Sequence, residues 1–473
     1  MHEITAQDRK DIQGPLVYGY AQLRDAYFIV FKIEDAAAFK TWLGNTTFHN
    51  SEKSPEGSCL NIAFTANGLK KIVGGKSKIT KEAGFDQCFL EGMDTEYRNR
   101  ILGDIDYNAP KNWKWGNRND DRAHGVLMIY AANDNLLEKA YNSESEKFKG
   151  ALSQNSISKS IRLNNDKEHF GFTDGISQPV LKGLARGSSE HNFINPGEVI
   201  LGHLNAYDKL PLSPKIDGFD LGKNGSYMVM HDMQQDVKAF WQKIKDYGDD
   251  PIKIASEMLG RWPNGIPLVM AETEPDAIKL KQEKEKELSP GRLLTFLNDF
   301  QYFEKDKDGL KCPIGAHIRR GNPKDSKNEN PEHPNEVSNK HRVLRRGKSY
   351  GKPLAESMEI KDMIAALDKP DNEERGLNFI CFNSDIKRQF EFIQQTWINN
   401  TNFVGLYDEV DPIIGVHSKY DSATNSLKMV PTKFTEPACP FRHEYNNIPP
   451  FVKIRAGGYF FFPGINAIKF LAK

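Results

Sequence analysis

Short apolar runs of strand length recur along the 473-residue chain, and each leads directly into a helical pattern. Aromatic and β-branched residues favour strands, whereas Asp and Thr are favoured at the residue before a helix. In the first half, the runs are 27–33, 60–64 and 126–132, and the helices after them are predicted to open at Asp35, Thr65 and Asp134.

The same order of strand and helix returns in the second half at 226–231, 377–382 and 459–462. In the helix predicted to follow 377–382, apolar residues at helical spacing indicate one face packed on a sheet: Ile386, Phe390, Ile393 and Trp397. Three units on each side of the middle predict two similar α+β domains, 1–165 and 166–473. Antiparallel sheets covered by helices on one face fit these units better than a parallel array.

Two strongly polar segments interrupt this pattern. Residues 279–287 form a charge run, which predicts an exposed helix. Residues 321–340 form a Pro- and Asn-rich segment that we interpret as a solvated loop. This loop separates two clusters of basic residues.

The overall charge excludes one class of partner. The chain has 64 Lys and Arg against 64 Asp and Glu, so it lacks the basic excess of a nucleic-acid binder. No apolar run reaches the roughly 18 residues of a membrane span, and the polar start favours a cytoplasmic location. The five scattered cysteines predict reduced, mostly buried thiols and not a disulfide framework.

Three motifs carry candidate chemistry. GFTDGISQP places Asp174 among glycines that permit a sharp turn, CPIGAHIRRGNP contains His317, and HRVLRRGKSYG contains Arg345. Taken alone, each motif is also compatible with a structural role. Five arginines fall within 28 residues, which predicts an anionic group among them, such as the two carboxylates of a cofactor: Arg319, Arg320, Arg342, Arg345 and Arg346.

Together, these motifs resemble those of the dye-decolorizing peroxidases, and specifically the larger subgroup of that family. GLNFICFNSDIKRQFEFIQQTWINN, DPIIG and AGGYFFFPG add to the resemblance, which covers nearly the whole chain from about residue 11. It implies two ferredoxin-like domains in an arrangement like a dimeric α+β barrel. It also implies one haem b per chain, held mainly by the C-terminal domain.

The resemblance also implies roles for single residues. His317 would be the proximal ligand of the haem iron, and Asp174 and Arg345 would form the distal pair. Leu377 and Phe379 match apolar residues that restrict the distal pocket. Asp411 in DPIIG falls where a carboxylate holds the proximal histidine.

The implied activity is a peroxidase reaction. Hydrogen peroxide would be reduced, and bulky organic, phenolic or dye substrates, together with small organic reductants, would then be oxidised in one-electron steps. Tyr350 and Trp397 match positions where fungal relatives carry redox-active side chains, so both are candidates for a surface electron relay. A turn role for Tyr350 and a core role for Trp397 are equally compatible with the sequence.

Other interpretations remain open at this point. The chain could bind haem or handle iron without a peroxidase role. Cys312 or Cys439, each followed by Pro, could supply a thiolate ligand, and His317, His333 and His341 could form a non-haem metal site. A homodimer is compatible with the sequence. Loading into an encapsulin shell is not expected, because the sequence ends directly on the last predicted helix.

Overall fold

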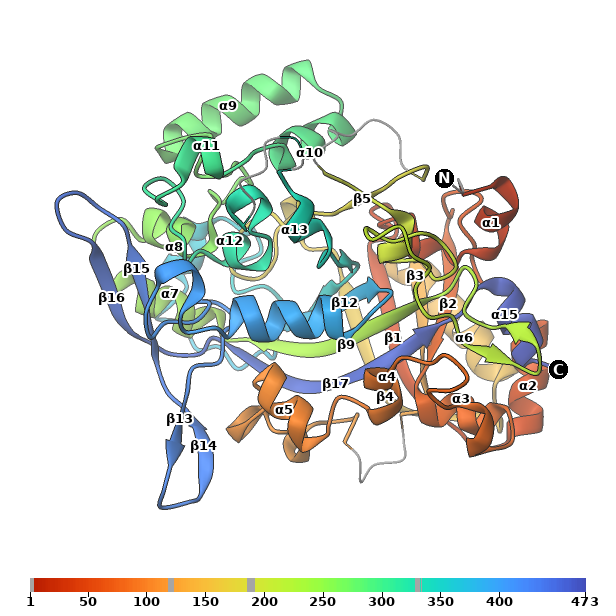
Figure 1. The fold of residues 1–473 in the computed structure, drawn as a ribbon. Coiled ribbons are helices and arrows are strands. Elements are labelled where there is room, and N and C mark those ends of the chain that lie inside the picture. The colour runs from red at the N-terminus through yellow and green to blue at the C-terminus, as the bar shows by residue number, and fades with distance from the viewer. Residues whose placement is uncertain (1–3, 118–122, 185–191, 328–331, 333) are drawn as a thin grey trace.

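The computed structural model describes residues 4–117, 123–184, 192–327, 332 and 334–473 (Figure 1). Its strands are β1 (Asp25–Ile33), β2 (Ser58–Phe64), β3 (Gly125–Ala131), β4 (Leu152–Ile161), β5 (Val180–Leu181), β6 (Phe193–Ile194), β7 (Lys215–Ile216), β8 (Phe219–Asp220), β9 (Ser226–Gln235), β10 (Leu344–Arg345), β11 (Lys348–Tyr350), β12 (Gly376–Asn383), β13 (Ser418–Asp421), β14 (Ser426–Met429), β15 (Thr432–Glu436), β16 (His443–Ile448) and β17 (Val452–Phe462).

Its α-helices are α1 (Ala6–Asp11), α2 (Ala36–Asn45), α3 (Ala66–Ile72), α4 (Gln87–Glu91), α5 (Glu96–Leu102), α6 (Asp134–Lys147), α7 (Val237–Lys245), α8 (Pro251–Leu259), α9 (Glu274–Glu287), α10 (Pro290–Asn298), α11 (Phe303–Asp306), α12 (His317–Gly321), α13 (Glu336–Asn339), α14 (Ile360–Ala365) and α15 (Ile465–Leu471). The segment after β12 is wound as two π-helical pieces, η9 (Lys387–Glu391) and η10 (Ile393–Ile398).

The main sheet closes into a barrel. Its strands follow the order β10-β12-β11-β4-β1-β3-β2-β17-β9, and β12 also pairs with β9, so the two ends of the order meet. Neighbouring strands in this sheet are antiparallel, for example β1 with β3 and β12 with β9. Closure leaves few unpaired strand edges.

Each half of the chain contributes four neighbouring strands to the barrel. The first half supplies β4-β1-β3-β2, and the second supplies β11-β12-β9-β17, with β10 continuing the edge beside β12. Both sets have the strand order of a ferredoxin-like sheet. The halves join where β11 pairs with β4 and β17 pairs with β2.

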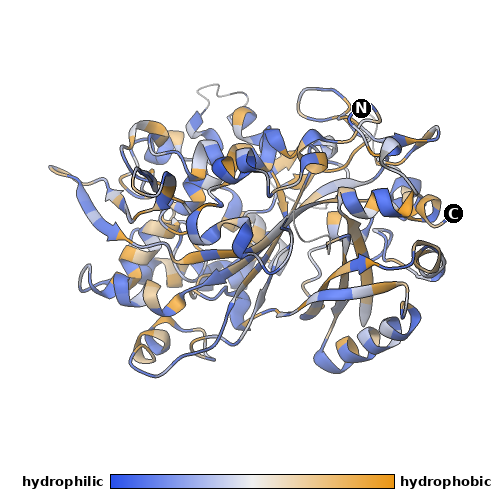
Figure 2. Ribbon diagram, turned by 90° about the horizontal axis from the view of Figure 1, so that it is seen from below, coloured by the Kyte–Doolittle hydropathy of each residue, from blue (hydrophilic) through white to orange (hydrophobic). Residues whose placement is uncertain are grey.

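Alternating side chains divide the barrel into an inside and an outside core. On β1, Phe28 and Val30 point into the barrel, whereas Ile29 and Phe31 pack in the core under the outer helices. This is the period of two that a strand imposes. Figure 2 shows apolar segments along the barrel strands and helices that alternate between apolar and polar residues.

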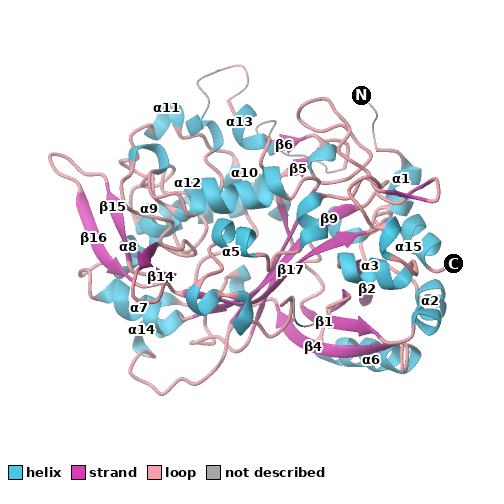
Figure 3. Cartoon of the chain, turned by 60° about the horizontal axis from the view of Figure 1, so that its bottom comes forward, coloured by secondary structure: helices cyan, strands magenta, loops and turns pink. Residues whose placement is uncertain are grey.

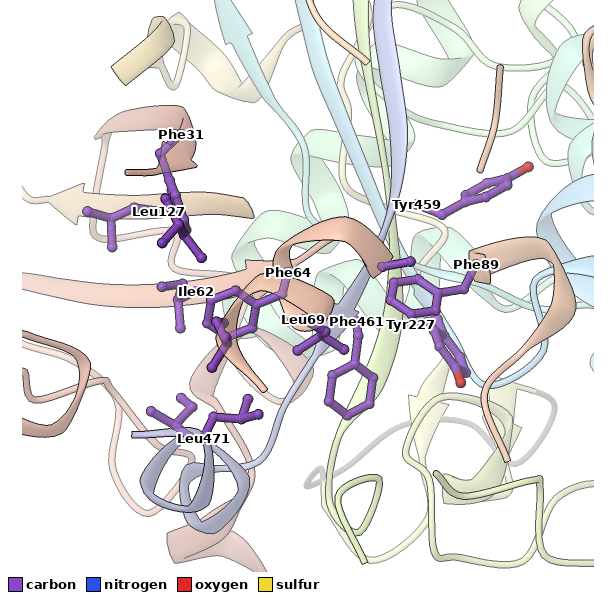
Figure 4. Close-up of a cluster of buried hydrophobic side chains, with 14 of the residues drawn as sticks. Phe31, Ile62, Phe64, Leu69, Phe89, Leu127, Tyr227, Tyr459, Phe461 and Leu471 are labelled. Atoms are coloured by element: carbon purple, nitrogen blue, oxygen red, sulfur yellow. The ribbon is translucent and has the colours of Figure 1, made fainter. Parts of the chain in front are cut away.

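The outer core covers the junction between the halves. In Figure 4, Phe64 of β2 and Phe461 of β17 lie in one cluster with Leu69 of α3 and Leu471 of α15. Figures 1 and 3 show α2, α3, α6 and α15 around the first four strands, whereas α7 to α12 build the opposite side. The site described below lies on that second side.

The structure confirms the predicted fold class and the predicted succession of strands and helices. Asp35 and Thr65 cap α2 and α3 as expected, and α6 begins at Asp134 as expected, with Asn133 as its cap because the Asn133 side chain accepts the N–H of Leu136. The charge run lies in α9, and four of the five free cysteines are buried. Among the described residues, no helix is long and apolar enough to cross a membrane. The domain boundary at 165/166 stays a prediction.

Candidate haem site

His317 is held by a buried carboxylate. It is the first residue of α12, and its Nδ1 donates to Oδ2 of Asp411 at 2.9 Å. The Asp411 side chain is fully buried, whereas that of His317 is 28% exposed. No hydrogen bond involves Nε2 of His317 within the described residues. The ring is therefore oriented with one nitrogen available to a ligand.

The surroundings of Asp411 favour its ionised form. Burial acts to raise the pKa of Asp411, but the charge and hydrogen bond of His317, with the N–H groups of Ile413 and Ile414, lower it. Burial acts to lower the pKa of His317, but Asp411 outweighs it and raises that pKa. Asp411 is thus an ionised acceptor whose position is fixed by three donors.

Asp174 lies at the end of a tight hairpin. Lys167 and Thr173 form an antiparallel bridge, and the N–H of Asp174 donates to the carbonyl of Asp166 at 2.9 Å. Gly171 and Gly175 both have positive φ, as the sharp turn predicted around this acid requires. The Asp174 side chain is exposed, and no hydrogen bond of its carboxylate is found in the described part of the chain.

Glu168, which the sequence analysis missed, binds inside this hairpin. Its carboxylate accepts the N–H groups of Phe170 and Phe172 at 3.0 and 3.2 Å and the side-chain amide of Gln235 at 2.9 Å. Burial raises the pKa of Glu168 to about 7, and the charge of Asp174 adds to this increase. Glu168 also raises the pKa of His317, so its charge acts on both residues.

Arg345, Leu377 and Phe379 share the outer face of the barrel. Arg345 ends β10 and pairs with Cys381 on β12, and alternation along β12 puts Leu377 and Phe379 on the same face. The charge of Arg345 lowers the pKa of His317. The structure therefore gathers Arg345, His317, Glu168 and Asp174 within electrostatic reach of one another, although no ion pair joins Arg345 to Asp174 in the described residues.

Three buried cations lie close to Arg345. Arg261, Lys324 and Arg342 are 5%, 3% and 6% exposed. Burial lowers the pKa of both arginines to about 10, with Arg345 adding to the decrease. The pKa of Lys324 is lowered well below its usual value by burial, Arg342 and Arg261.

These cations have mostly neutral partners. Arg261 donates to two backbone carbonyls and to Ser177, Lys324 donates to the carbonyl of Asn298, and Arg342 makes one long contact of 3.5 Å to the carbonyl of Ser177. Ser177 belongs to the GFTDGISQP motif, and Gln178 beside it accepts the N–H of Arg345 at 3.0 Å. That motif therefore holds the cations as well as Asp174.

The structure corrects the explanation of the arginine cluster. Arg319 pairs with buried Asp306, Arg320 donates to the carbonyls of Trp397, Asn400 and Glu409, and Arg346 donates to Pro15. The protein itself therefore supplies hydrogen-bond partners for these three arginines. Of the five arginines, only Arg342 and Arg345 are left to bind an anion. Arg261 and Lys324 add to the positive charge beside them. The segment 321–340 is also not fully solvated, because Lys324 is buried.

The residues fit haem. A buried cation without a counterion is costly, and Arg342 has five N–H donors but a single long contact. The two carboxylates of haem would supply the missing negative charge. A histidine held at Nδ1 by a carboxylate is also a typical axial ligand.

Tyr350 and Trp397 do not lie at the surface, which corrects that part of the expectation. Tyr350 is 9% exposed because β11 is enclosed between β4 and β12, and Trp397 is 4% exposed because its ring packs on Phe392 and His341. A role for either residue in electron transfer stays a prediction.

The alternative ligand sets gain no support. Burial raises the pKa of Cys312 to about 12, which disfavours a thiolate. His341 stacks on Phe392 with ring centroids 3.8 Å apart, and His333 lies outside the described residues. Among the described residues, no three or more His, Cys, Asp or Glu side chains are placed to hold a metal ion.

Comparisons with known proteins agree with this geometry. The family model described as the DyP dimeric alpha+beta barrel domain matches residues 11–166. A dye-decolorizing peroxidase of Auricularia auricula-judae is 27% identical over 98% of this chain and 87% of its own length. One of Mycena epipterygia is 28% identical over 99% of this chain and 87% of its own length. A crystal structure of the Auricularia auricula-judae enzyme aligns with a TM-score of 0.76 at 24% identity, covering 98% of this chain and 100% of that one.

The fold and site define an α+β-barrel protein in which a carboxylate-held histidine and several buried cations fit a haem group. Similarity to named peroxidases along nearly the whole chain identifies it further. Along nearly its whole length the chain is similar to the dye-decolorizing peroxidases, and it is an enzyme of that type.

Proposed function

We propose that this chain reduces hydrogen peroxide and oxidises organic reductants, with His317 as the residue that would hold haem iron and Asp174 and Arg345 as the residues that would act on hydrogen peroxide. The observation that carries this proposal is the 2.9 Å hydrogen bond from Nδ1 of His317 to buried Asp411. It leaves Nε2 to bind iron. The relatives are named as peroxidases, so a haem-binding or iron-handling role without this activity has less support.

Haem, when bound, supplies the two electrons that reduce hydrogen peroxide. Asp411 accepts a hydrogen bond from Nδ1 of His317 and would make the imidazole a stronger electron donor to bound iron. Its three hydrogen bonds prevent the carboxylate from turning away. The His317–Asp411 pair thus fixes the ligand and adjusts its basicity.

Asp174 would move protons on the face that hydrogen peroxide approaches. Its carboxylate would accept a proton from one oxygen of hydrogen peroxide and return it to the other oxygen, which leaves as water. The guanidinium of Arg345 stabilises negative charge on that leaving oxygen. Leu377 and Phe379 make the face apolar and exclude bulky reductants from it.

Arg342, Lys324 and Arg261 would hold the haem carboxylates. Their convergence beside Arg345 leaves uncompensated positive charge in the protein interior. Two carboxylates in this position would form charge-assisted hydrogen bonds, which are stronger than those the cations make to carbonyls.

Replacing Asp174 tests this assignment. Asp174→Asn removes the proton acceptor without changing the shape, so the rate constant for reaction with hydrogen peroxide should fall about 10²- to 10⁴-fold. Stopped-flow absorbance of the haem-loaded enzyme measures it. The matched control is Asp368→Asn at an exposed position, which should retain the wild-type rate. An undiminished rate in Asp174→Asn contradicts the assignment.

Bulky reductants would be oxidised at a distance from the haem. The position of Trp397 supports this idea, because the helix that carries His317, α12, packs against η10, which carries Trp397. Arg320 of α12 also donates to the Trp397 carbonyl. Leu406, in the same cluster as Trp397, precedes Tyr407, which is 76% exposed and could form the outer end. Tyr350→Phe with Trp397→Phe should lower dye turnover and spare the reaction with peroxide. Unchanged dye turnover would remove both residues from the relay.

Three properties stay proposals. Phenolic reductants are plausible substrates, since a solved dye-decolorizing peroxidase of this fold was obtained in complex with 2,6-dimethoxyphenol. A homodimer is proposed from the family resemblance. A cytoplasmic location is also a proposal, and cell fractionation tests it.

A further inference from the structure

A small cavity lies outside the barrel, between the end of α5, the strands β9 and β17 and the loop after Asp411. Its apolar wall includes Met233 of β9 and Ile414. Its polar groups are Asp104, Asn108, His231 and Gln394. Nothing in the mechanism above uses these four side chains.

Two of the polar groups lack partners although they are buried. Asp104 is 2% exposed, and its Oδ2 has no hydrogen bond. His231 is 3% exposed, and its Nδ1 has no hydrogen bond, while its Nε2 lies 2.9 Å from the sulfur of Met93. A buried polar atom without a partner costs about 1–3 kcal/mol, and two around one cavity indicate a missing partner.

The other two polar groups already have partners. Oδ1 of Asn108 accepts the N–H of Ile454 at 3.0 Å, and Nε2 of Gln394 donates to the carbonyl of Leu102 at 3.3 Å. They therefore do not satisfy Asp104 or His231. The missing partner must come from outside the chain.

The chemistry and size of the cavity restrict its occupant. Burial raises the pKa of Asp104 to about 8 and lowers the pKa of His231 to about 4, so both are neutral near pH 7. A neutral occupant is therefore favoured over an ion. The free space between its lining side chains is of the order of one water molecule. An organic substrate does not fit.

We propose that this cavity binds one water-sized molecule that donates and accepts hydrogen bonds, between Oδ2 of Asp104 and Nδ1 of His231. Water and hydrogen peroxide share this chemistry. The cavity lies behind the wall of the proposed haem pocket, because Met233 pairs with Leu377, and His231 pairs with Phe379. A role of this cavity in supplying hydrogen peroxide to the haem rests on the proposed function. The existence of the binding site does not.

A high-resolution crystal structure of the haem-loaded enzyme tests the site directly. We expect electron density for one small molecule within hydrogen-bond distance of Asp104 and His231. An absence of electron density at this place, or a direct hydrogen bond between the two side chains, overturns the proposal. Neither result affects the roles of His317 and Asp174, which the haem spectrum and the Asp174→Asn rate test separately.

A second crystal distinguishes the two occupants. The cyanide-inhibited enzyme does not consume peroxide, so its crystals can be soaked in hydrogen peroxide. Elongated density for two bonded oxygens identifies peroxide, and an unchanged round peak identifies water; either supports the site.

A matched pair of variants gives an independent check. Asp104→Asn keeps a hydrogen-bonding group and should retain the molecule, whereas Asp104→Leu should exclude it. Retention of the molecule in Asp104→Leu would contradict the assigned partners.

Discussion

Glu168 is a side chain whose charge acts on both Asp174 and His317. It accepts three hydrogen bonds, which favour the ionised form, but burial dominates and raises its pKa to about 7. In the unfolded chain, a Glu titrates near 4.3. The folded protein therefore binds more protons than the unfolded chain between about pH 4.5 and 7.

This difference predicts how stability changes with pH. Because the folded state holds the Glu168 proton longer, the free energy of unfolding falls as pH rises through this window, by at most about 3–4 kcal/mol. Glu168→Gln should remove that part of the decrease. Urea unfolding at pH 5 and pH 8 measures it, with exposed Glu356→Gln as the control. An identical pH dependence in Glu168→Gln and wild type would contradict the raised pKa.

Replacing Arg342 should raise the stability of the haem-free protein but lower its affinity for haem. Arg342→Met removes a buried cation with one long hydrogen bond, so the haem-free protein should gain thermal stability. The same change removes a partner of the haem carboxylates, so haem should bind about 10-fold more weakly or worse. Thermal unfolding and haem titration measure the two effects.

The control for Arg342→Met is Arg292→Met, at an exposed position of α10. It should change neither quantity. Weaker haem binding without a gain in haem-free stability would contradict the claim that Arg342 has only one weak partner within the protein.

At the scale of residues, the motifs located the site but not its whole electrostatics. Asp174, His317 and Arg345 stand in recognisable strings, and the structure brings them together. Glu168, Arg261 and Lys324 carry no such signal, because their importance comes from burial beside other charges. Tertiary contacts alone decide that burial.

At the scale of elements, β12 closes the barrel. It pairs with β9 on one side and with β10 and β11 on the other. Gly376 begins β12 at a crowded point. A Cβ there would lie 2.0 Å from the Met233 carbonyl oxygen and 2.7 Å from the Tyr350 hydroxyl.

Gly376→Ala should therefore destabilise the protein. The backbone of β9 cannot move without disturbing closure, so we expect a loss of about 1–3 kcal/mol or more. Gly291→Ala in α10 is the matched control, because a Cβ there meets nothing within 4 Å and alanine favours a helix. Chemical denaturation measures both, and equal stability of the two variants would contradict the crowding argument.

The six strand–helix units could be predicted because their strands are apolar and their helices have local capping signals. Strand β4 (LSQNSISKSI) could not, since it is polar along most of its length and offers no hydrophobic pattern. Strands β10 and β11 are too short to show a period. These three elements close one side of the barrel.

At the scale of the whole molecule, one chain completes the barrel. The strands β1 to β4 and the strands β9, β11, β12 and β17 meet at two seams, β11–β4 and β2–β17. A second copy of the chain is therefore not needed for closure. The proposed homodimer would use a surface outside these seams.

The central proposal at this scale is that haem binds between the hairpin of Asp174 and the helix of His317. An absorption spectrum of the purified protein, before and after one equivalent of hydrogen peroxide, tests this claim most directly. The account predicts a histidine-ligated ferric haem spectrum that changes within the mixing time and returns when a phenolic reductant is added. A protein that cannot be loaded with haem, or a haem spectrum that peroxide leaves unchanged, would contradict it.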